Sequence, residues 1–537
     1  MTPALLKHIY VIFPFIARER ISYRTANIKW ILTCEYGKIC KNVPFFRICG
    51  LITEFQIPVY EMLFNSLKFA LFFIVVFAVY WLVPNRYRWV VLLTASCFFY
   101  MSWSAVYILL LLLLTAVSYF AAILIEEKHT KSAVSLSIAA VLIPLLVFKY
   151  LGFLSETLSG VLSAFSINLH PLTLKLLMPI GISFYTFQII GYLADVYRGD
   201  IKAERHFGYY ALFVSFFPQI ISGPIGRAGS LIPQYREEKL FDSSKAFYAV
   251  KLMVWGFFKK LVVADNLAVF ADVVFADVTS YSGFSLVLAS LFYTVQIYCD
   301  FSGYTDIARG VAGLLGIDLP LNFNVPYLAT SLKEFWARWH MSLSTWLRDY
   351  IYIPLGGSRC SKTRSCLNIV ITFLISGLWH GADWSFVLWG AMHGLIQAFE
   401  KLAGINPYRG SGKLKRFARA VPVFIFVSLA WIFFRADSVS DAFYVISHLF
   451  TGISSPGAYI SGGISAVAGL RKIRLLIIIF LYILPVAVFD TLSLRGDVIE
   501  KLSSVSKPVR YAVYFAVLLL TTLFASASGV SFVYFQF

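Results

Sequence analysis

The sequence predicts an all-α, multi-pass integral membrane protein, and two observations support this class. Hydrophobic residues make up 59% of the chain and charged residues only 14%, whereas a soluble domain usually carries about 25% charged residues. Apolar runs of about 20 residues, enough to cross a bilayer, recur from end to end. These runs are continuous, unlike the alternating segments of roughly 10 residues that build a transmembrane β-barrel. We expect roughly 11 to 13 transmembrane or re-entrant helices.

The distribution of basic residues indicates topology. The formal net charge is +18, but Lys and Arg lie in short loops between apolar runs, as the charges of cytoplasmic loops do. No basic domain stands apart, so we expect no nucleic-acid partner. The seven cysteines form no CxxC pair and the chain has no HExxH motif. We therefore interpret the thiols as reduced and structural, and we expect no metal.

Residues 1–61 differ from the rest of the chain because short apolar pieces alternate there with Arg and Lys. Met62 then begins MLFNSLKFALFFIVVFAVYWLVP, which predicts a first membrane helix. We interpret 1–61 as an N-terminal extension that is either not native or poorly ordered, and 62–537 as a single membrane-embedded domain. The apolar runs of this domain are Leu67–Val83, Trp89–Trp103, Val106–Ile125, Ala133–Phe148, Phe247–Val263, Phe284–Tyr298, Val421–Phe434, Leu475–Phe489 and Tyr511–Phe524.

Two segments in the first half of the domain carry Pro and Gly. Met178–Gly199 predicts a helix that is entered through Pro and Gly. Ser215–Gln234 is dense in both residues, and in a membrane protein irregular backbone persists only where protein buries it or where it lines a wet cavity. We expect a re-entrant or interfacial segment there.

A helix is predicted from Ser331 to about Ile353. Ser331 and Glu334 fit a capping box at its start, and Pro354 ends it. Polar residues form one stripe and aromatic residues lie opposite, which is typical of a helix at a membrane interface. His340 falls near the boundary between the two faces.

The following apolar segments predict a hairpin that carries His380. Leu367–Trp379 has 13 residues, or about 20 Å of helix, which is too short for a hydrocarbon core of about 30 Å. The run breaks at His380–Asp383 and resumes as far as Phe399. Basic loops flank both outer ends, so we place them in the cytoplasm and the turn partway through the membrane or near its outer side. A histidine there is a candidate general base, because its pKa lies near neutrality.

Six motifs in this part of the chain are specific enough to indicate a family. They are MPIGISFYTFQ, FFPQIISGPIGR, QIYCDFSGYTDIARG, NFNVPYLATSLKEFWARWHMSLSTWLRDYIYIPLGGSR, GLWHGADWSFVLWGAMHG and WIFFRA. In this order the chain resembles the membrane-bound O-acyltransferase (MBOAT) family, most closely its alginate O-acetyltransferase branch. The resemblance covers Met62 to about Arg435, with a motif core at 178–435.

The resemblance implies helices around a central tunnel, a catalytic His380, and an assisting His340 near the cytoplasmic mouth. It implies a cytoplasmic thioester donor, acetyl-CoA, as substrate, with no tightly bound cofactor. The acceptor would be a hydroxyl on the far side of the inner membrane. A periplasmic or secreted acetyltransferase partner would then pass the acetyl group to a surface polysaccharide, such as alginate or peptidoglycan.

Further residues are candidates for contact with the tunnel or a substrate, namely Trp379, Asp383, Arg338, Trp336, Asp300 and Tyr304. The four that are not tryptophans have an ordinary structural alternative. Asp383 either orients His380 or caps the next helix, and capping is favoured. Arg338 either binds donor phosphates or pairs with a neighbouring charge, and pairing is favoured. Asp300 and Tyr304 either line the tunnel or end a helix, and neither is favoured.

Functions of other classes stay open at this point. A transporter of an acyl donor or polymer also contains broken helices, and a scaffold for polysaccharide assembly needs no chemistry. Within the enzyme class, D-alanyl transfer to teichoic acid would use the same scaffold. The chain lacks the HxxxD arrangement, the GxSxG elbow and the P-loop lysine motif, so those chemistries are set aside. His393 is interpreted as a helix-packing residue.

Overall fold

The computed structural model describes residues 62–167, 170–171, 177–408, 410, 412–467, 470–526 and 532. These residues belong to one compact unit and contain helices but no β-strand. The all-α prediction is therefore confirmed for the described part of the chain. The prediction for 1–61 lies outside the described residues.

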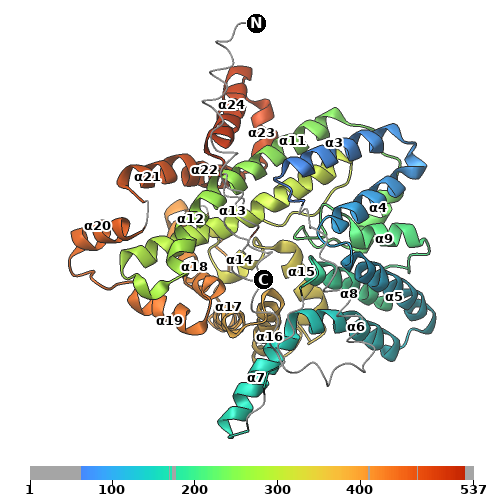
Figure 1. The fold of residues 1–537 in the computed structure, drawn as a ribbon, viewed down its shortest axis with the longest axis horizontal. Helices are drawn as coiled ribbons and strands as arrows, with labels where there is room; N and C mark the ends of the chain where they lie inside the picture. The colour runs from blue at the N-terminus through green and yellow to red at the C-terminus, as the bar shows by residue number, and fades with distance from the viewer. Residues whose placement is uncertain are drawn as a thin grey trace, which may run out of the picture. The chain divides into compact units, whose positions relative to one another are not determined.

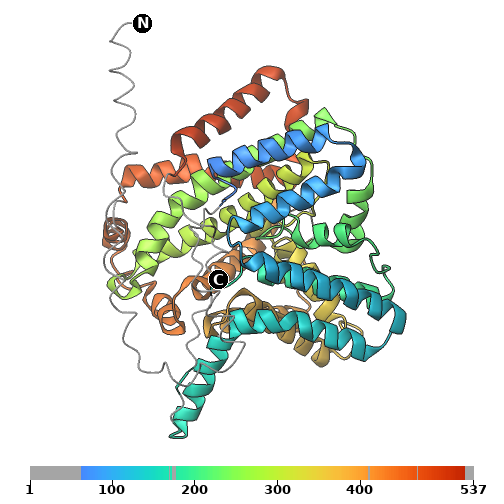
Figure 2. The ribbon, with the colours of Figure 1, turned by 45° about the vertical axis from the view of Figure 1, so that its right-hand side comes forward.

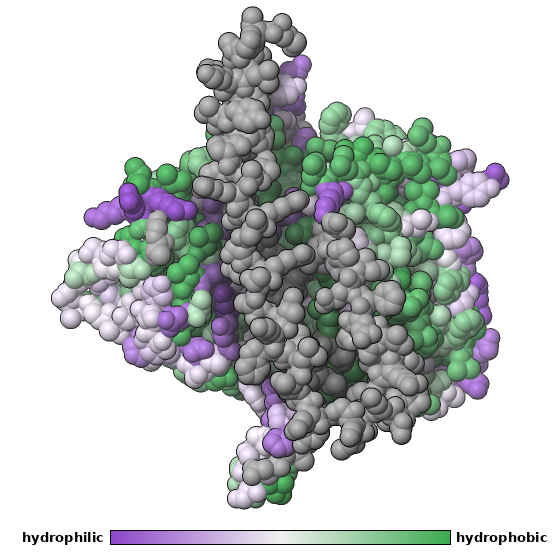
Figure 3. Space-filling view, in the orientation of Figure 1, coloured by the Kyte–Doolittle hydropathy of each residue, from purple (hydrophilic) through white to green (hydrophobic). Residues whose placement is uncertain are grey.

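Six described segments are long and apolar enough to cross a membrane by length and composition. They are α5 (Tyr107–Lys128), the segment Lys131–Ala164 with α6 (Lys131–Leu145) and α7 (Leu151–Ala164), α13 (Phe284–Leu314), α18 (Lys413–Arg435), the segment Lys472–Ser493 with α21 (Lys472–Ile477) and α22 (Leu484–Ser493), and α24 (Lys507–Phe524). The shorter α3 (Leu67–Leu82) is also apolar, and it exposes large hydrophobic side chains. Figure 3 shows hydrophobic residues gathered over the upper right of this face, where α3 lies. A multi-pass membrane protein is thus confirmed.

The other described helices are shorter or more polar. Among them are α4 (Asn85–Met101), α8 (Ile182–Arg198), α9 (Phe207–Ser215), α10 (Ala228–Arg236), α11 (Ser243–Phe257), α12 (Asp265–Phe275), α14 (Leu332–Trp336), α15 (Met341–Leu347), α16 (Lys362–His380), α17 (Trp384–Leu402), α19 (Val439–His448), α20 (Pro456–Ala466) and α23 (Val498–Ser504). Several helices are continued or joined by π-helical segments, namely η1 (Leu146–Tyr150), η2 (Phe258–Ala264), η5 (Arg348–Tyr352) and η6 (Ile478–Ile483).

The 31-residue helix α13 lies between two hydrophobic cores. At 1.5 Å per residue it is about 46 Å long, and most of its side chains are buried. Its C-terminal part packs into a core with α3 to α6 and α8 to α10, whereas its first part packs with α11, α12 and α16 to α19. Figure 1 shows α4, α5, α8 and α9 to the right of α13, and α18 to α21 to its left. His380 lies where these two cores meet, since its ring contacts Trp379 of the first core and Trp389 of the second.

The first part of the Pro- and Gly-rich segment is irregular and buried, as predicted, whereas its last residues, 228–234, belong to α10. Residues 216–227 form turns between α9 and α10, and Phe216 and Phe217 are fully buried. Gly181 approaches this segment so closely that a Cβ there would lie 2.2 Å from the Ile220 carbonyl oxygen. Its φ of +72° also favours glycine. Protein contacts thus enclose the irregular backbone, as burial in a membrane protein requires.

The prediction of one continuous helix from Ser331 to Ile353 is wrong in its middle. Ser331 caps the start as expected, since its hydroxyl accepts from the Glu334 amide at 3.1 Å. However, α14 ends at Trp336 and α15 begins after His340, whose φ is +43°. Backbone hydrogen bonds to residues 322–324 replace the helical hydrogen bonds here. The Met341 amide donates to the Asn322 carbonyl, and the Asn324 amide donates to the Arg338 carbonyl.

Candidate active site

The hairpin of α16 and α17 holds His380 at its closed end, and glycines set its packing. A Cβ on Gly377 would lie 2.2 Å from the Phe386 carbonyl oxygen, and one on Gly390 would lie 2.3 Å from that of Phe373. Small residues let two membrane helices approach this closely. The first arm is longer than predicted, because α16 starts inside the basic loop at Lys362 and has 19 residues.

His380 is the last residue of α16 and is 4% exposed. Its ring lies among aromatic side chains, with centroid distances of 5.0 Å to Trp379, 5.1 Å to Trp389 and 5.2 Å to Phe434. The His340 ring is 6.4 Å away, measured between centroids. The fold therefore brings together the two histidines that the sequence singles out, although they are 40 residues apart in the chain.

Asn322 fixes how the His340 ring can act. Its side-chain oxygen accepts hydrogen bonds from the Ser342 amide at 3.2 Å and the Ser342 hydroxyl at 2.9 Å. The same oxygen lies 3.2 Å from His340 Nδ1. A carbonyl oxygen only accepts, so Nδ1 must carry hydrogen for this bond to form. In neutral His340, Nε2 is then the nitrogen that can accept a proton.

Asn322 was missed in the sequence analysis, although it lies in the NFNVPY motif. An asparagine in a loop 18 residues before the histidine gives no local signal of contact. The motif itself was the available clue, because it continues directly into the FWARWH element.

A second aromatic layer lies behind His380. The Trp336 indole donates to His393 Nδ1 at 3.2 Å, and Trp336 also contacts Trp389 at a centroid distance of 5.6 Å. His393 is fully buried among these rings. This environment supports the interpretation of His393 as a packing residue and gives Trp336 a structural contact next to the site.

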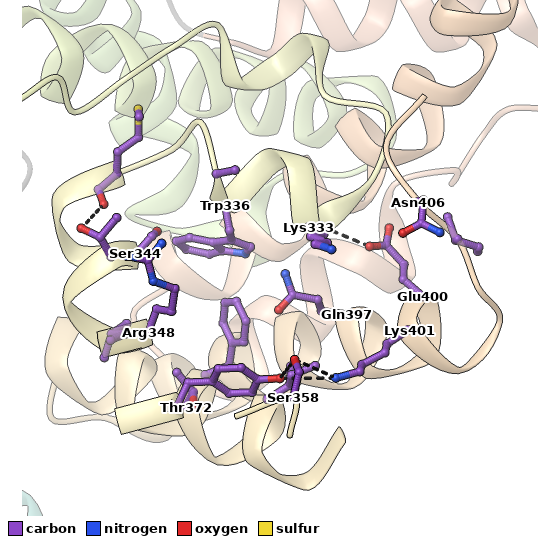
Figure 4. A pocket seen from close by; sticks show the side chains of 18 of the residues that line it. Lys333, Trp336, Ser344, Arg348, Ser358, Thr372, Gln397, Glu400, Lys401 and Asn406 are labelled. Atoms are coloured by element: carbon purple, nitrogen blue, oxygen red, sulfur yellow. Dashed lines mark hydrogen bonds between the residues drawn. The ribbon is translucent and has the colours of Figure 1, made fainter. Parts of the chain in front are cut away.

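A cavity of about 680 Å³ opens near the other end of the hairpin. Figure 4 shows Lys333, Arg348 and Lys401 around it, with Trp336 on one wall. Glu400 is held by the backbone amides of Leu332, at 2.7 Å, and Lys333, at 3.1 Å. The cavity thus combines a cationic rim with an aromatic wall, and neither His340 nor His380 is among its lining residues.

The remaining candidates have defined contacts. Trp379 packs against Phe184 and its indole donates to the Ser183 carbonyl at 3.4 Å. Asp383 accepts from the Ser385 amide at 2.7 Å and is the N-cap of α17, as favoured from the sequence. Arg338 pairs with Glu334 at 2.7 Å, which is also the favoured alternative.

Asp300 and Tyr304 belong to different contacts on α13. Asp300 accepts from Lys260 at 2.6 Å, and Lys260 also pairs with Asp265 at 2.8 Å. Tyr304 packs edge-on against Phe64, with a centroid distance of 5.0 Å. Between them, Phe301 of the same helix packs against His340 at 4.7 Å. Asp300, which forms a buried ion pair with Lys260 of η2, is therefore the sequence neighbour of Phe301, whose ring contacts His340.

Comparison with known proteins identifies the family. The family model of MBOAT, the membrane-bound O-acyltransferase family, matches residues 203–434. The chain is 39% identical over 396 residues to a probable alginate O-acetylase AlgI of Azotobacter vinelandii, an alignment that covers 73% of this chain and 78% of the relative. A Pseudomonas aeruginosa relative of the same description is also 39% identical, with 73% and 75% covered. A peptidoglycan O-acetyltransferase of Helicobacter pylori is 35% identical over 426 residues, with 72% and 80% covered. The chain therefore belongs to the membrane-bound O-acyltransferase family, in its alginate O-acetyltransferase-like branch, and is an O-acyltransferase.

Proposed function

We propose that this protein moves an acetyl group from cytoplasmic acetyl-CoA across the inner membrane to a hydroxyl acceptor, for O-acetylation of a cell-surface polysaccharide such as alginate or peptidoglycan. One observation carries the proposal: two buried histidines meet at the closed end of a hairpin whose other end borders a cationic cavity. The descriptions of the relatives, alginate O-acetylase and peptidoglycan O-acetyltransferase, support the acetyl group and the polysaccharide. A periplasmic or secreted acetyltransferase partner would carry the group onward.

The cavity provides a suitable place for the donor. Lys333, Arg348 and Lys401 present cationic groups around it, and such groups bind phosphates through charge-assisted hydrogen bonds. Trp336 and Phe373 form an apolar wall of the cavity, which suits the acyl-bearing arm of a thioester. We assign the phosphates of acetyl-CoA to the rim and its thioester end to the inner wall.

The donor must pass an aromatic partition to reach His380. Phe373, on the cavity wall, lies seven residues before His380 on α16, which is about 10 Å along the helix. The Trp336 ring contacts both Phe373 and Trp389. Movement of these rings would join the cavity to the histidine pair, and it would keep water away from the thioester before the acceptor arrives.

The reaction moves one proton from the acceptor oxygen to the departing sulfur and exchanges one bond at carbon. His380 takes the proton from the acceptor hydroxyl, whose oxygen forms a bond to the thioester carbonyl carbon. The carbon–sulfur bond then breaks, and the proton ends on the departing sulfur as a thiol. Because Nδ1 of His340 is engaged by Asn322, a neutral His340 accepts only at Nε2. We therefore assign His340 to proton transfer with His380 rather than to stabilisation of the oxyanion.

The experiment uses membrane vesicles that contain the full-length protein and radiolabelled acetyl-CoA on the cytoplasmic side. His380→Ala should abolish the transfer of label to polymer while the amount of protein in the membrane stays unchanged. His448→Ala is the matched control, because that ring bonds within its own helical turn. Normal transfer by His380→Ala would refute the assignment, and uptake of donor without transfer by the wild type would favour a transporter.

A further inference from the structure

The C-terminal end of α16 poses a hydrogen-bonding problem because it lies inside the protein. A helix leaves its last four carbonyl groups without intrahelical donors, and away from water each unsatisfied group costs several kcal/mol. Here all four carbonyls have donors. The Gly377 carbonyl accepts from the Gly381 amide at 3.2 Å, which uses only the local chain.

The other three carbonyls accept hydrogen bonds from two side chains in a distant part of the sequence. The Tyr150 hydroxyl donates to the Leu378 carbonyl at 2.6 Å. The Lys149 ammonium donates to the Trp379 carbonyl at 2.7 Å and to the His380 carbonyl at 2.9 Å. Two adjacent residues, about 230 positions earlier in the chain, thus hold the last turn of α16.

An irregular helix delivers these two side chains. Lys149 and Tyr150 end the π-helical segment η1, which joins α6 to α7. Pro144 lies just before it, inside α6, and proline lacks the amide hydrogen that continues a regular helix. π-Helical turns are rare and are often found at functional sites. The same segment then continues into α7 (Leu151–Ala164), which extends away from the other helices in Figures 1 and 2.

The positive charge of Lys149 suits its position at the C-terminus of α16. A cation inside a membrane protein is costly unless it is paired, and such residues are usually functional. The C-terminus of a helix carries a partial negative charge that attracts a cation. Lys149 meets that end through two carbonyl groups, one of them belonging to His380 itself.

We propose that Lys149 and Tyr150 form a clamp that sets the position of the His380 ring for acyl transfer. They are positioning residues, because they act on the backbone of His380 and not on the substrate. Without the clamp, the last turn of α16 can unwind or rotate, and the imidazole moves relative to the donor carbonyl and to His340. This inference rests on the proposed role of His380, and the test below separates the two.

The test compares Lys149→Met, Lys149→Gln and Tyr150→Phe in the full-length protein, with Lys131→Met as control, since Lys131 is exposed at the start of α6. Transfer of label from acetyl-CoA gives kcat and the donor KM, and thermal unfolding of the purified protein reports folding. Misplacing a catalytic group by about 1 Å can cost about a hundredfold in rate. We expect Lys149→Met to lower kcat by between about tenfold and a hundredfold, with the donor KM unchanged.

Lys149→Gln retains an amide donor that can reach a carbonyl, so it should recover part of the kcat that Lys149→Met loses. Tyr150→Phe removes one hydroxyl and should lower kcat less than Lys149→Met. Variants that melt earlier but keep the wild-type kcat per folded molecule would show a structural role only and overturn the clamp. If Lys149→Met does not fold, Tyr150→Phe and Lys149→Gln decide by the same criterion. A fully active His380→Ala would instead refute the proposed function.

Discussion

Replacing Gly390 by alanine tests whether the closeness of the hairpin positions His380. The added Cβ would lie 2.3 Å from the Phe373 carbonyl oxygen, whereas ordinary contact begins at 3.4 Å. The oxygen is part of the backbone of α16, so the two helices must separate by about 1 Å, because close-packed interiors transmit such strain. Phe373 lies two helical turns before His380, and the displacement therefore reaches the end of the hairpin.

Two effects should follow from this separation. Overpacking of a well-packed interior costs about 1–3 kcal/mol, so the thermal midpoint of Gly390→Ala should fall. A shift of about 1 Å at the catalytic group should lower the transfer rate by up to about a hundredfold. The assay measures acetyl transfer from radiolabelled acetyl-CoA per folded molecule, together with thermal unfolding.

The matched control is Gly462→Ala in α20. A Cβ at Gly462 meets no atom within 4 Å, and a glycine-to-alanine change at such a helical site stabilises a protein by about 0.4–1 kcal/mol through the unfolded state. It should keep the wild-type rate. If Gly390→Ala had the wild-type rate and thermal midpoint, the glycine contact would not position the site, and the reasoning would be refuted.

Three further predictions concern the contacts of His340, the cationic cavity and the buried ion pair of Lys260. Asn322→Ala should lower the free energy of unfolding by about 1–3 kcal/mol, because it removes the acceptor of buried donors. It should also slow acetyl transfer. Unchanged unfolding and transfer would contradict this prediction. Arg348→Met and Lys401→Met should each raise the donor KM by about tenfold, because each removes one charge-assisted hydrogen bond to the donor. The kcat should change little, and steady-state kinetics measures both constants. Lys260→Met should destabilise the fold by about 3–5 kcal/mol, because it removes the cation that pairs with two buried carboxylates, whereas exposed Lys245→Met should not; thermal unfolding of both variants decides.

The sequence was sufficient where the signal is local. Apolar runs and charge placement predicted the membrane class, and the capping residues Ser331 and Asp383 occupy the helix starts expected of them. The Pro- and Gly-rich segment before α10 is irregular and buried, as its composition indicated. In each case the cause lies within a few residues of the effect.

The sequence was insufficient where a distant segment decides. No Gly or Pro lies between Trp336 and His340, so helix propensity predicted a continuous helix there. The break in that helix is imposed by backbone hydrogen bonds to a distant segment. Lys149 closes an apolar run and resembles an ordinary topology charge. Its role depends on the carbonyls of Trp379 and His380, which only the folded chain brings near.

Three interruptions of regular helix explain how backbone polar atoms come to lie in an apolar interior. The π-helical turn at Lys149, the left-handed residue His340 and the end of α16 at His380 all meet in one place. Continuous helices would satisfy their own backbone groups and offer only side chains. Interrupted helices expose carbonyl and amide groups that must find partners, and these partners fix the geometry.

His340 allows this view to be tested, because its backbone and its ring can be separated. A φ of +43° is unfavourable for most residues, but asparagine tolerates it well. His340→Asn should therefore fold better than His340→Ala, by up to about 1–2 kcal/mol, and thermal unfolding of both variants measures the difference. If the ring transfers protons, His340→Asn should still lose about a hundredfold or more in rate. Full activity in a stable His340→Asn would show that residue 340 serves only the backbone break.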